Sequence, residues 1–265
     1  LANAAAVFDQ PAWADAAVTA FEFITNNLCP NGNLVHGYRQ GQPKHRALLD
    51  DYANMARAAL MLHEIHGGER YLQQARAWVA AVEAHFADAE RGGYFFSSAQ
   101  ATDVIARMRH ANDNAVPSGN GIMVGVLTRL WLLTGDDAYR LRAEAVARSF
   151  SAQMSKQALA MTTLLNNVEF MLRPLQIVIM GDRGDETVKA MLAAVHSLAL
   201  PNKVHQVLTP GETLPPGHPA TGMAQIDGQA TAYVCVGQTC SLPQTKAVDL
   251  HAALTMAATT ISPGS

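Results

Sequence analysis

The sequence is poor in charge and in cysteine, and it contains no long apolar run. Charged residues make up 15% of the 265 residues and the formal net charge is −3, so no basic surface for nucleic acid is expected. No stretch approaches the ~18 consecutive apolar residues of a membrane-spanning helix, and no signal peptide is recognisable. Three cysteines are too few for a disulfide scaffold, which favours a reducing, cytoplasmic location. Neither nucleic acid nor a membrane is therefore an expected partner.

Several motifs of known chemistry are also missing from the sequence. It has no H-E-x-x-H pattern and no Cys/His pair at ligand spacing, so we expect no metal. No glycine-rich nucleotide-binding loop follows a predicted strand, and we expect no cofactor. Ser118 does not lie in a G-x-S-x-G frame, so a serine nucleophile is not indicated.

Three segments of the chain share a helical-hairpin pattern. Each has an apolar helix end, a break rich in Gly, Asp or Pro, and then an aromatic residue with Ala four positions later. The aromatic residues are Trp13, Tyr71 and Tyr139, which lie 58 and 68 residues apart, a spacing found in helical-repeat arrays. The first copy keeps only the last turns of its leading helix, residues 1–8. We therefore expect the natural polypeptide to extend upstream.

Apolar residues recur at helical spacing before and after two of these breaks, within 49–86 and 122–150. Gly67 and Gly135 fit helix C-caps, and Asp136 or Asp137 fits an N-cap. Gly-rich segments at 32–38 and 92–97 predict extended loops or small β-hairpins on one rim. Stacked hairpins whose long loops share a rim form a ring or solenoid with a polar mouth.

The composition changes after Pro174. Short apolar runs at 176–181, 204–208 and 231–236 predict strands, and 187–198 has helical periodicity. The Pro- and Gly-rich segment 210–219 predicts a loop. We therefore divide the chain into a helical-hairpin part, residues 1–173, and a small α/β subdomain with a C-terminal helix, residues 174–265.

Cys235 and Cys240 are separated by four residues, not by the two of a thioredoxin motif. A buried thiol is the preferred interpretation in a reducing compartment. A strand and turn that bring the two sulfurs together would instead favour a redox role. The first interpretation predicts free thiols, and the second predicts a reducible bond.

A set of motifs occurs along the chain in a characteristic order. They are Asp50-Asp51-Tyr52-Ala53, Gly92-Gly93-Tyr94-Phe95, Arg107, the run from Asp113 to Asn120, and Ala232-Tyr233-Val234-Cys235 followed by Cys240 and Pro243. With these motifs in this order, the chain resembles the C-terminal portion of the spermatogenesis-associated, thioredoxin-domain-containing protein family. The resemblance extends over nearly the whole chain. The resemblance implies a thioredoxin-like domain in the full-length protein. It also implies an (α/α)6 toroid similar to N-acylglucosamine 2-epimerases and six-hairpin glycosidases.

The expected fold is therefore mainly α, with αα-hairpins that form roughly half of such a toroid before the small α/β subdomain. A half-ring with an exposed apolar side is also a candidate for pairing with a second copy of the chain.

The segment from Arg107 to Asn120 combines cations, a carboxylate, amides and a hydroxyl directly before an apolar helix. Such side chains can converge on a polar ligand, and the helix start adds oriented N–H donors. We therefore predict a site for a small polar ligand. The resemblance makes a sugar the expected ligand and an aldose/ketose isomerase or 2-epimerase the expected enzyme.

The candidate catalytic residues are His36, Asp51, Arg107 and Asp113. His36 would move a proton next to a carbonyl, and Arg107 would stabilise the enolate. The candidate substrate-binding residues are Asp50, Tyr94, Asn114, Ser118 and Asn120.

Each candidate also has a purely structural interpretation. Asp50 and Asp51 fit the start of a helix, where carboxylates cap free N–H groups. Arg107 and Asp113 would close the loop by pairing with each other. Hydroxyl and amide groups beside Pro117 fit a helix cap, and an aromatic residue such as Tyr94 often fills a core. If these interpretations hold, the chain is a non-catalytic binding or scaffold module that accompanies the thioredoxin-like domain.

Overall fold

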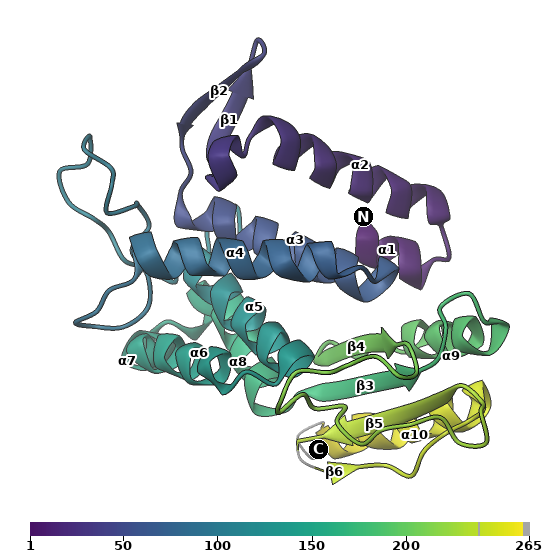
Figure 1. Ribbon diagram of the computed structural model, residues 1–265. Helices are drawn as coiled ribbons and strands as arrows, with labels where there is room; N and C mark the ends of the chain where they lie inside the picture. The colour runs from purple at the N-terminus through teal and green to yellow at the C-terminus, as the bar shows by residue number, and fades with distance from the viewer. Residues whose placement is uncertain (238, 262–265) are drawn as a thin grey trace.

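The computed structural model describes residues 1–237 and 239–261, and its architecture is mainly helical, as predicted (Figure 1). The helices of the first part are α1 (Ala2–Val7), α2 (Pro11–Asn27), α3 (Leu49–His66), α4 (Glu69–Phe86), α5 (Gly119–Thr134), α6 (Asp137–Ser149), α7 (Ser151–Lys156) and α8 (Thr162–Leu172). Two short 3-10 turns, Pro30–Gly32 and Ala158–Met161, lie between them. A hairpin of β1 (Val35–Arg39) and β2 (Gln42–Arg46) projects from this part; the sequence predicted an extended loop or a small β-hairpin at 32–38, and the second strand lies beyond that segment.

The predicted breaks join α3 to α4 and α5 to α6. Gly135 has a φ of 75° and donates its N–H to the carbonyl of Trp131, so it ends α5 in the left-handed conformation that glycine adopts without strain. The Asp136 side chain then accepts the N–H of Ala138 and begins α6. Gly67 ends α3 with a φ of 71°. Local sequence signals thus position both hairpins.

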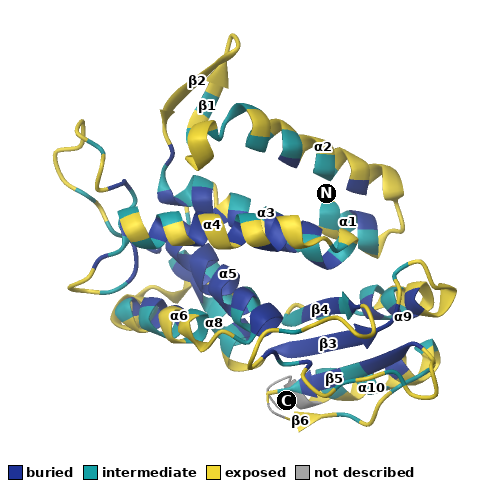
Figure 2. Ribbon diagram, in the orientation of Figure 1, coloured by how far each residue is buried: buried dark blue, intermediate teal, exposed yellow. Residues whose placement is uncertain are grey.

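Helices α3, α5 and α8 run in the same direction. Asp50, in the first turn of α3, bonds Gly119 at the start of α5, whereas Glu64 near the end of α3 contacts Arg129 near the end of α5. Fourteen of the sixteen residues of α5 are buried, and Figure 2 shows this helix as buried along its length. A Cβ at Gly125 would clash with the side-chain amide of Asn167 on α8, so glycine permits the close approach of these helices.

The strand-containing part begins after α8. It consists of β3 (Leu175–Met180), α9 (Glu186–Ser197), β4 (Lys203–Leu208), β5 (Thr231–Val236), β6 (Thr239–Cys240) and α10 (Ala247–Ile261). The sheet order is β4-β3-β5-β6, with β3 and β4 parallel and β5 antiparallel to β3. Parallel neighbours need a crossover connection, and α9 provides it.

The two faces of this sheet have different partners. Ile177 and Ile179 pack with apolar residues of α9 and α10, whereas Val204 belongs to the helical core and Gln176 donates to the Leu132 carbonyl at 2.6 Å. The sheet is therefore attached to the end of α5 by one face and covered by two helices on the other.

Buried charges lie at this attachment. The Glu64 carboxylate is 2.8 Å from the Arg129 guanidinium, and it accepts the backbone N–H of His205 on β4. Arg183, in the loop after β3, donates to the carbonyls of Glu64 and Ile65 at 3.0 and 2.9 Å. The last turn of α3 is thereby capped by the strand-containing part.

The preferred interpretation of Cys235 and Cys240 as thiols is wrong, because they form a disulfide. The antiparallel register of β5 and β6 places the two residues directly opposite each other. Cys235 is buried and Cys240 is exposed. Within the described residues, no helix combines the length and hydropathy needed to cross a membrane.

Candidate functional site

The beginnings of α3, α5 and α8 lie at the same end of the helical layer, which we call the rim. Asp50 Oδ1 accepts the backbone N–H of Gly119 at 2.8 Å and so connects the starts of α3 and α5. Asp113 Oδ2 accepts the backbone N–H of Thr163 at 2.8 Å and connects the loop before α5 to the start of α8. Carboxylates are stable there because the positive ends of the helix dipoles face them.

His36 and Asp51 form a hydrogen-bonded pair at the rim. The Nδ1 atom of His36, on β1, lies 2.9 Å from Asp51 Oδ2 and 3.1 Å from Oδ1. Asp51 Oδ2 also accepts the Leu48 N–H at 2.7 Å, so the predicted cap is present as well. The His36 side chain is 54% exposed. An imidazole oriented by a carboxylate and open to solvent has the arrangement of an acid/base group.

Asp50 stands next to this pair and is half-buried. Burial raises its pKa, an effect that the hydrogen bond from Gly119 and the charge of His110 only partly offset. The neighbouring Asp51 carboxylate raises the pKa further. The raised pKa favours the protonated form of Asp50 more than in an ordinary aspartate.

Asp113 has internal partners. Its Oδ1 accepts the N–H of Ser118 at 2.9 Å, and its Oδ2 accepts the Thr162 hydroxyl at 3.0 Å in addition to Thr163. Burial alone would raise the pKa of Asp113, but these hydrogen bonds outweigh it and the pKa lies below its usual value. Asp113 is therefore a stable carboxylate that ties the loop to two helices.

Arg107 does not bind Asp113. Its guanidinium donates to the carbonyls of Ser97 and His85, each at 3.0 Å, and stacks on the Phe95 ring with 4.1 Å from Cζ to the centroid. The expectation that Arg107 and Asp113 close the loop by pairing is wrong, because the guanidinium binds the carbonyl of Ser97 in the loop and that of His85 in the last turn of α4. This guanidinium holds the loop and does not join the rim carboxylates.

Ser118, Asn120 and Tyr94 are buried, and their polar atoms are bonded internally. The Ser118 hydroxyl caps α5 by accepting from Gly121 and donates to the Ala111 carbonyl at 3.0 Å. Asn120 exchanges two 2.9 Å hydrogen bonds with the backbone of Tyr94 and donates a third to the His110 carbonyl. The Tyr94 hydroxyl bonds Glu83. These residues take the structural role that the sequence left open, whereas Asn114 is exposed.

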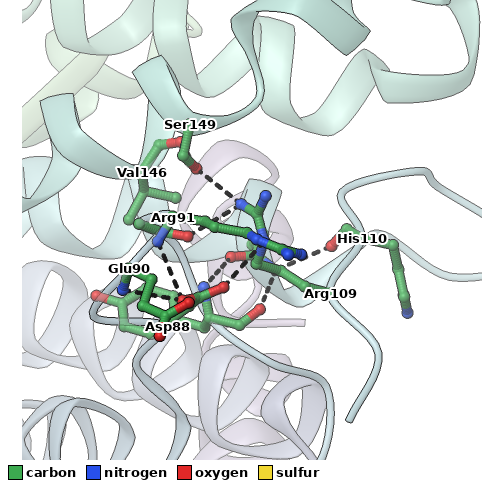
Figure 3. Close-up of polar contacts among 10 residues, drawn as sticks. Asp88, Glu90, Arg91, Arg109, His110, Val146 and Ser149 are labelled. Atoms are coloured by element: carbon green, nitrogen blue, oxygen red, sulfur yellow. Dashed lines mark hydrogen bonds and ion pairs between the residues drawn. The ribbon is translucent and has the colours of Figure 1, made fainter. Parts of the chain in front are cut away.

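Arg109 and Asp88 also fix this loop, and the sequence analysis did not select them. Arg109 donates to the Gly92 carbonyl at 2.9 Å and to the Ser149 hydroxyl at 3.3 Å, and its Nε lies 3.5 Å from Asp88 Oδ2 (Figure 3). Asp88 Oδ1 accepts the N–H groups of Glu90 and Arg91. An Asp before a Gly-Gly pair is the sequence signal of such a turn.

A cavity of about 570 Å³ lies on the side of α3, α5 and α8 that faces the 199–202 segment. None of His36, Asp51, Arg107 and Asp113 is among its lining residues. Two cations line it, Arg57 and Arg129, and neither belongs to a sequence motif that indicates a site. The predicted catalytic residues thus do not converge on this cavity: the structure brings His36, Asp51 and Asp50 together at the rim and keeps Arg107 in the loop.

Comparison with known proteins identifies relatives along most of the chain. It is 31% identical to the human spermatogenesis-associated protein 20 over 228 residues, which are 84% of this chain and 28% of the relative. The rat protein of the same name is 31% identical over 218 residues, 80% of this chain and 28% of that protein. An uncharacterized protein of Caenorhabditis elegans is 25% identical over 244 residues, 89% of this chain and 33% of that protein.

The chain thus spans little more than a quarter of the length of the two spermatogenesis-associated relatives. No model of a known protein family matches it. The match to the mammalian proteins agrees with the resemblance that the motifs of the chain indicate. This chain belongs to the family of spermatogenesis-associated protein 20.

Proposed function

We propose that this chain is part of a cytoplasmic, carbohydrate-active (α/α) toroid that binds a sugar at the rim. The observation that carries the proposal is the His36–Asp51 pair beside Asp50, at the point where α3 and α5 begin. The parallel direction of α3, α5 and α8, with α4 and α6 as returning helices, supports the toroid, because inner helices of such a ring all begin at one end.

The chemistry that this arrangement fits is proton transfer next to a carbonyl, as in aldose/ketose isomerisation or epimerisation. Neutral His36 would accept the proton from the carbon next to the carbonyl, and Asp51 would stabilise the imidazolium. Asp50, whose pKa is raised, would donate a proton to the carbonyl oxygen. In isomerisation, His36 would then deliver its proton to the former carbonyl carbon, while the enediol hydroxyl on the adjacent carbon returns a proton to Asp50, which gives the isomer and restores both groups. In epimerisation, His36 would return its proton to the opposite face of the same carbon, and the enol hydroxyl would return its proton to Asp50. Arg107 has no part in this scheme, because its donors are bound to Ser97 and His85.

The test is binding of aldoses and ketoses to the intact chain, followed by NMR, with exchange of the proton next to the carbonyl measured in deuterated water. We expect His36→Gln and Asp51→Asn to abolish exchange. The matched control is His251→Gln, which changes an exposed histidine on α10. Exchange that persists in both rim variants, or absence of sugar binding by the unmodified chain, would refute the proposal.

A second candidate function has its own support. Three of the candidate side chains form hydrogen bonds to other groups of the protein, as expected of a rigid scaffold; they are those of Arg107, Asp113 and Asn120. In that case the chain serves as a platform for a thioredoxin-like domain. Co-elution of this chain with that separately produced domain, together with failure to bind any sugar, would favour the scaffold.

A further inference from the structure

The cavity between α3, α5, α8 and the 199–202 segment has an apolar wall and a polar wall. Ile122, Val126, Phe170 and Leu200 form apolar parts of its surface. Arg57, Arg129, Asn166 and Asn202 bring cations and amides to it. A volume of about 570 Å³ lies within the range of small-molecule sites, which combine an apolar lining with a few polar groups.

The two cations of the cavity differ in how far their charge is compensated. Arg129 donates to the Glu64 carboxylate at 2.8 Å and to the Lys203 carbonyl at 3.1 Å, and its Cζ lies 4.8 Å from the centre of the Phe170 ring. Its charge is therefore satisfied within the protein. The Arg129 side chain therefore forms a fixed part of the cavity wall and contributes a positive potential, but few of its N–H groups are free to bind a ligand.

The guanidinium N–H groups of Arg57 are free to bind a ligand. Among residues 1–237 and 239–261, no carboxylate pairs with it and no carbonyl accepts from its guanidinium. Burial lowers the pKa of Arg57, and the positive charge of Arg129 lowers it further. Arg57 is nevertheless an exposed residue at the mouth of the cavity, and the like charge of Arg129 beside it favours the binding of an anion there.

The carboxylate that lines the cavity does not compensate the charge of Arg57. Glu169 is 3.6 Å from Arg173, in an i,i+4 pair on α8, and its charge does not enter among the causes of the Arg57 pKa shift. The planar guanidinium of Arg57 is thus available for two parallel hydrogen bonds to a phosphate or a carboxylate, the geometry that arginine favours.

We propose that this cavity binds a small organic anion, with its phosphate or carboxylate on Arg57 and its carbon skeleton against the apolar wall. Asn166 and Asn202 are amides suited to hydroxyl groups of such a ligand. Arg57 follows Asp50 by seven residues on α3, which is about 10 Å along the helix axis. The anion site is therefore separate from the rim, and it does not depend on the function proposed for His36 and Asp51.

Calorimetric titration of the intact chain with four probes tests the ligand class. Inorganic phosphate presents the anion alone, glucose 6-phosphate and glucuronate present a phosphate and a carboxylate on a sugar, and glucose is the neutral reference. We expect glucose 6-phosphate or glucuronate to bind at least about tenfold more tightly than glucose. Stronger binding of one of the two charged sugars identifies the anion. Equal binding of glucose, or no binding by any charged probe, would overturn the proposal.

The Arg57→Gln variant tests the residue. We expect its affinity for the preferred charged probe to fall at least about tenfold, whereas Arg148→Gln, at an exposed arginine of α6, leaves the affinity unchanged. Without ligand, the Tm of Arg57→Gln should equal or exceed that of the unmodified chain, because repulsion with Arg129 is relieved. The anion affinity of His36→Gln should be unaltered, which separates this site from the rim. Unchanged affinity in Arg57→Gln would refute the assignment.

Discussion

Replacement of Glu64 by glutamine removes a negative charge from the junction of α3, α5 and β4. The carboxylate accepts from Arg129 at 2.8 Å and from the backbone N–H of His205 at 3.3 Å. The side chains of Glu64 and Arg129 are 4% and 17% exposed, so solvent screens their interaction little. Glutamine has a similar shape and keeps one acceptor, which makes the change chiefly one of charge.

The expected cost follows from what Arg129 loses. Removal of one partner from a buried ion pair costs about 3–5 kcal/mol, because the other charge stays buried without compensation. Since the glutamine oxygen still accepts one hydrogen bond, we expect Glu64→Gln to lower the free energy of unfolding by about 3 kcal/mol. Urea unfolding followed by circular dichroism measures this free energy.

A double-mutant cycle separates the pair from its surroundings. Arg129→Met removes the other charge, so Glu64→Gln should cost about 2 kcal/mol less in that background than in the unmodified chain. Arg140→Met is a matched control, because Arg140 pairs with exposed Asp137 and half-buried Glu144 on α6 and should not couple to Glu64. A cost of Glu64→Gln below about 1 kcal/mol, or additivity of the two changes, would contradict this reasoning.

The same carboxylate makes stability depend on pH. Burial by itself would raise the pKa of Glu64, but Arg129 and then His205 outweigh it, and the pKa lies below the ordinary value of 4.5. A carboxyl group with a lowered folded-state pKa stabilises the protein above its unfolded-state pKa. This contribution is lost as the pH falls through the folded-state value, below about 4.5. Glu64→Gln should therefore be less sensitive than the unmodified chain to pH in this acid range.

Two further changes test other parts of the structure. Asn120→Ala leaves the buried N–H and carbonyl of Tyr94 without their 2.9 Å partners, so urea unfolding should show a loss of about 2–4 kcal/mol, whereas Asn114→Ala at an exposed position should cost little. Burial, with the charges of His205 and Lys203, lowers the pKa of His196 to about 4. The unfolded chain binds a proton near pH 6.5 while the folded chain does not, so stability should fall between about pH 6.5 and 4, and less so in His196→Gln. If the free energy of unfolding depends on pH in the same way in His196→Gln and in the unmodified chain, His196 does not cause the loss of stability.

The helical hairpins were predictable because their signals are local. Apolar spacing and the glycines at 67 and 135 defined the ends of α3 and α5, and the Asp136 cap was found where it was expected. The strands β3, β4 and β5 were likewise found as short apolar runs. The pairing of Cys235 with Cys240 was missed because it depends on the register of two strands, which the spacing of the cysteines does not determine.

The candidate site was predictable only as a set of polar residues. Sequence patterns indicated His36, Asp50 and Asp51, and these three residues lie together at the rim. They also indicated Arg107 and Asp113, which bind different partners. Arg57 was missed because it follows the ordinary pattern of a charged residue on the polar side of an amphipathic helix. Its importance comes from the helices and the loop that surround it.

By itself, the sequence determined the helices, their caps and the order of hairpins and strands, because these depend on residues a few positions apart. Only the tertiary structure decided which charges are satisfied and which remain free. Glu64 accepts the backbone N–H of His205, 141 residues further along the chain, and also binds Arg129. Arg57 on the same helix has no partner among the residues that the structure describes. Such partners depend on distances between remote segments, and no local pattern encodes those distances.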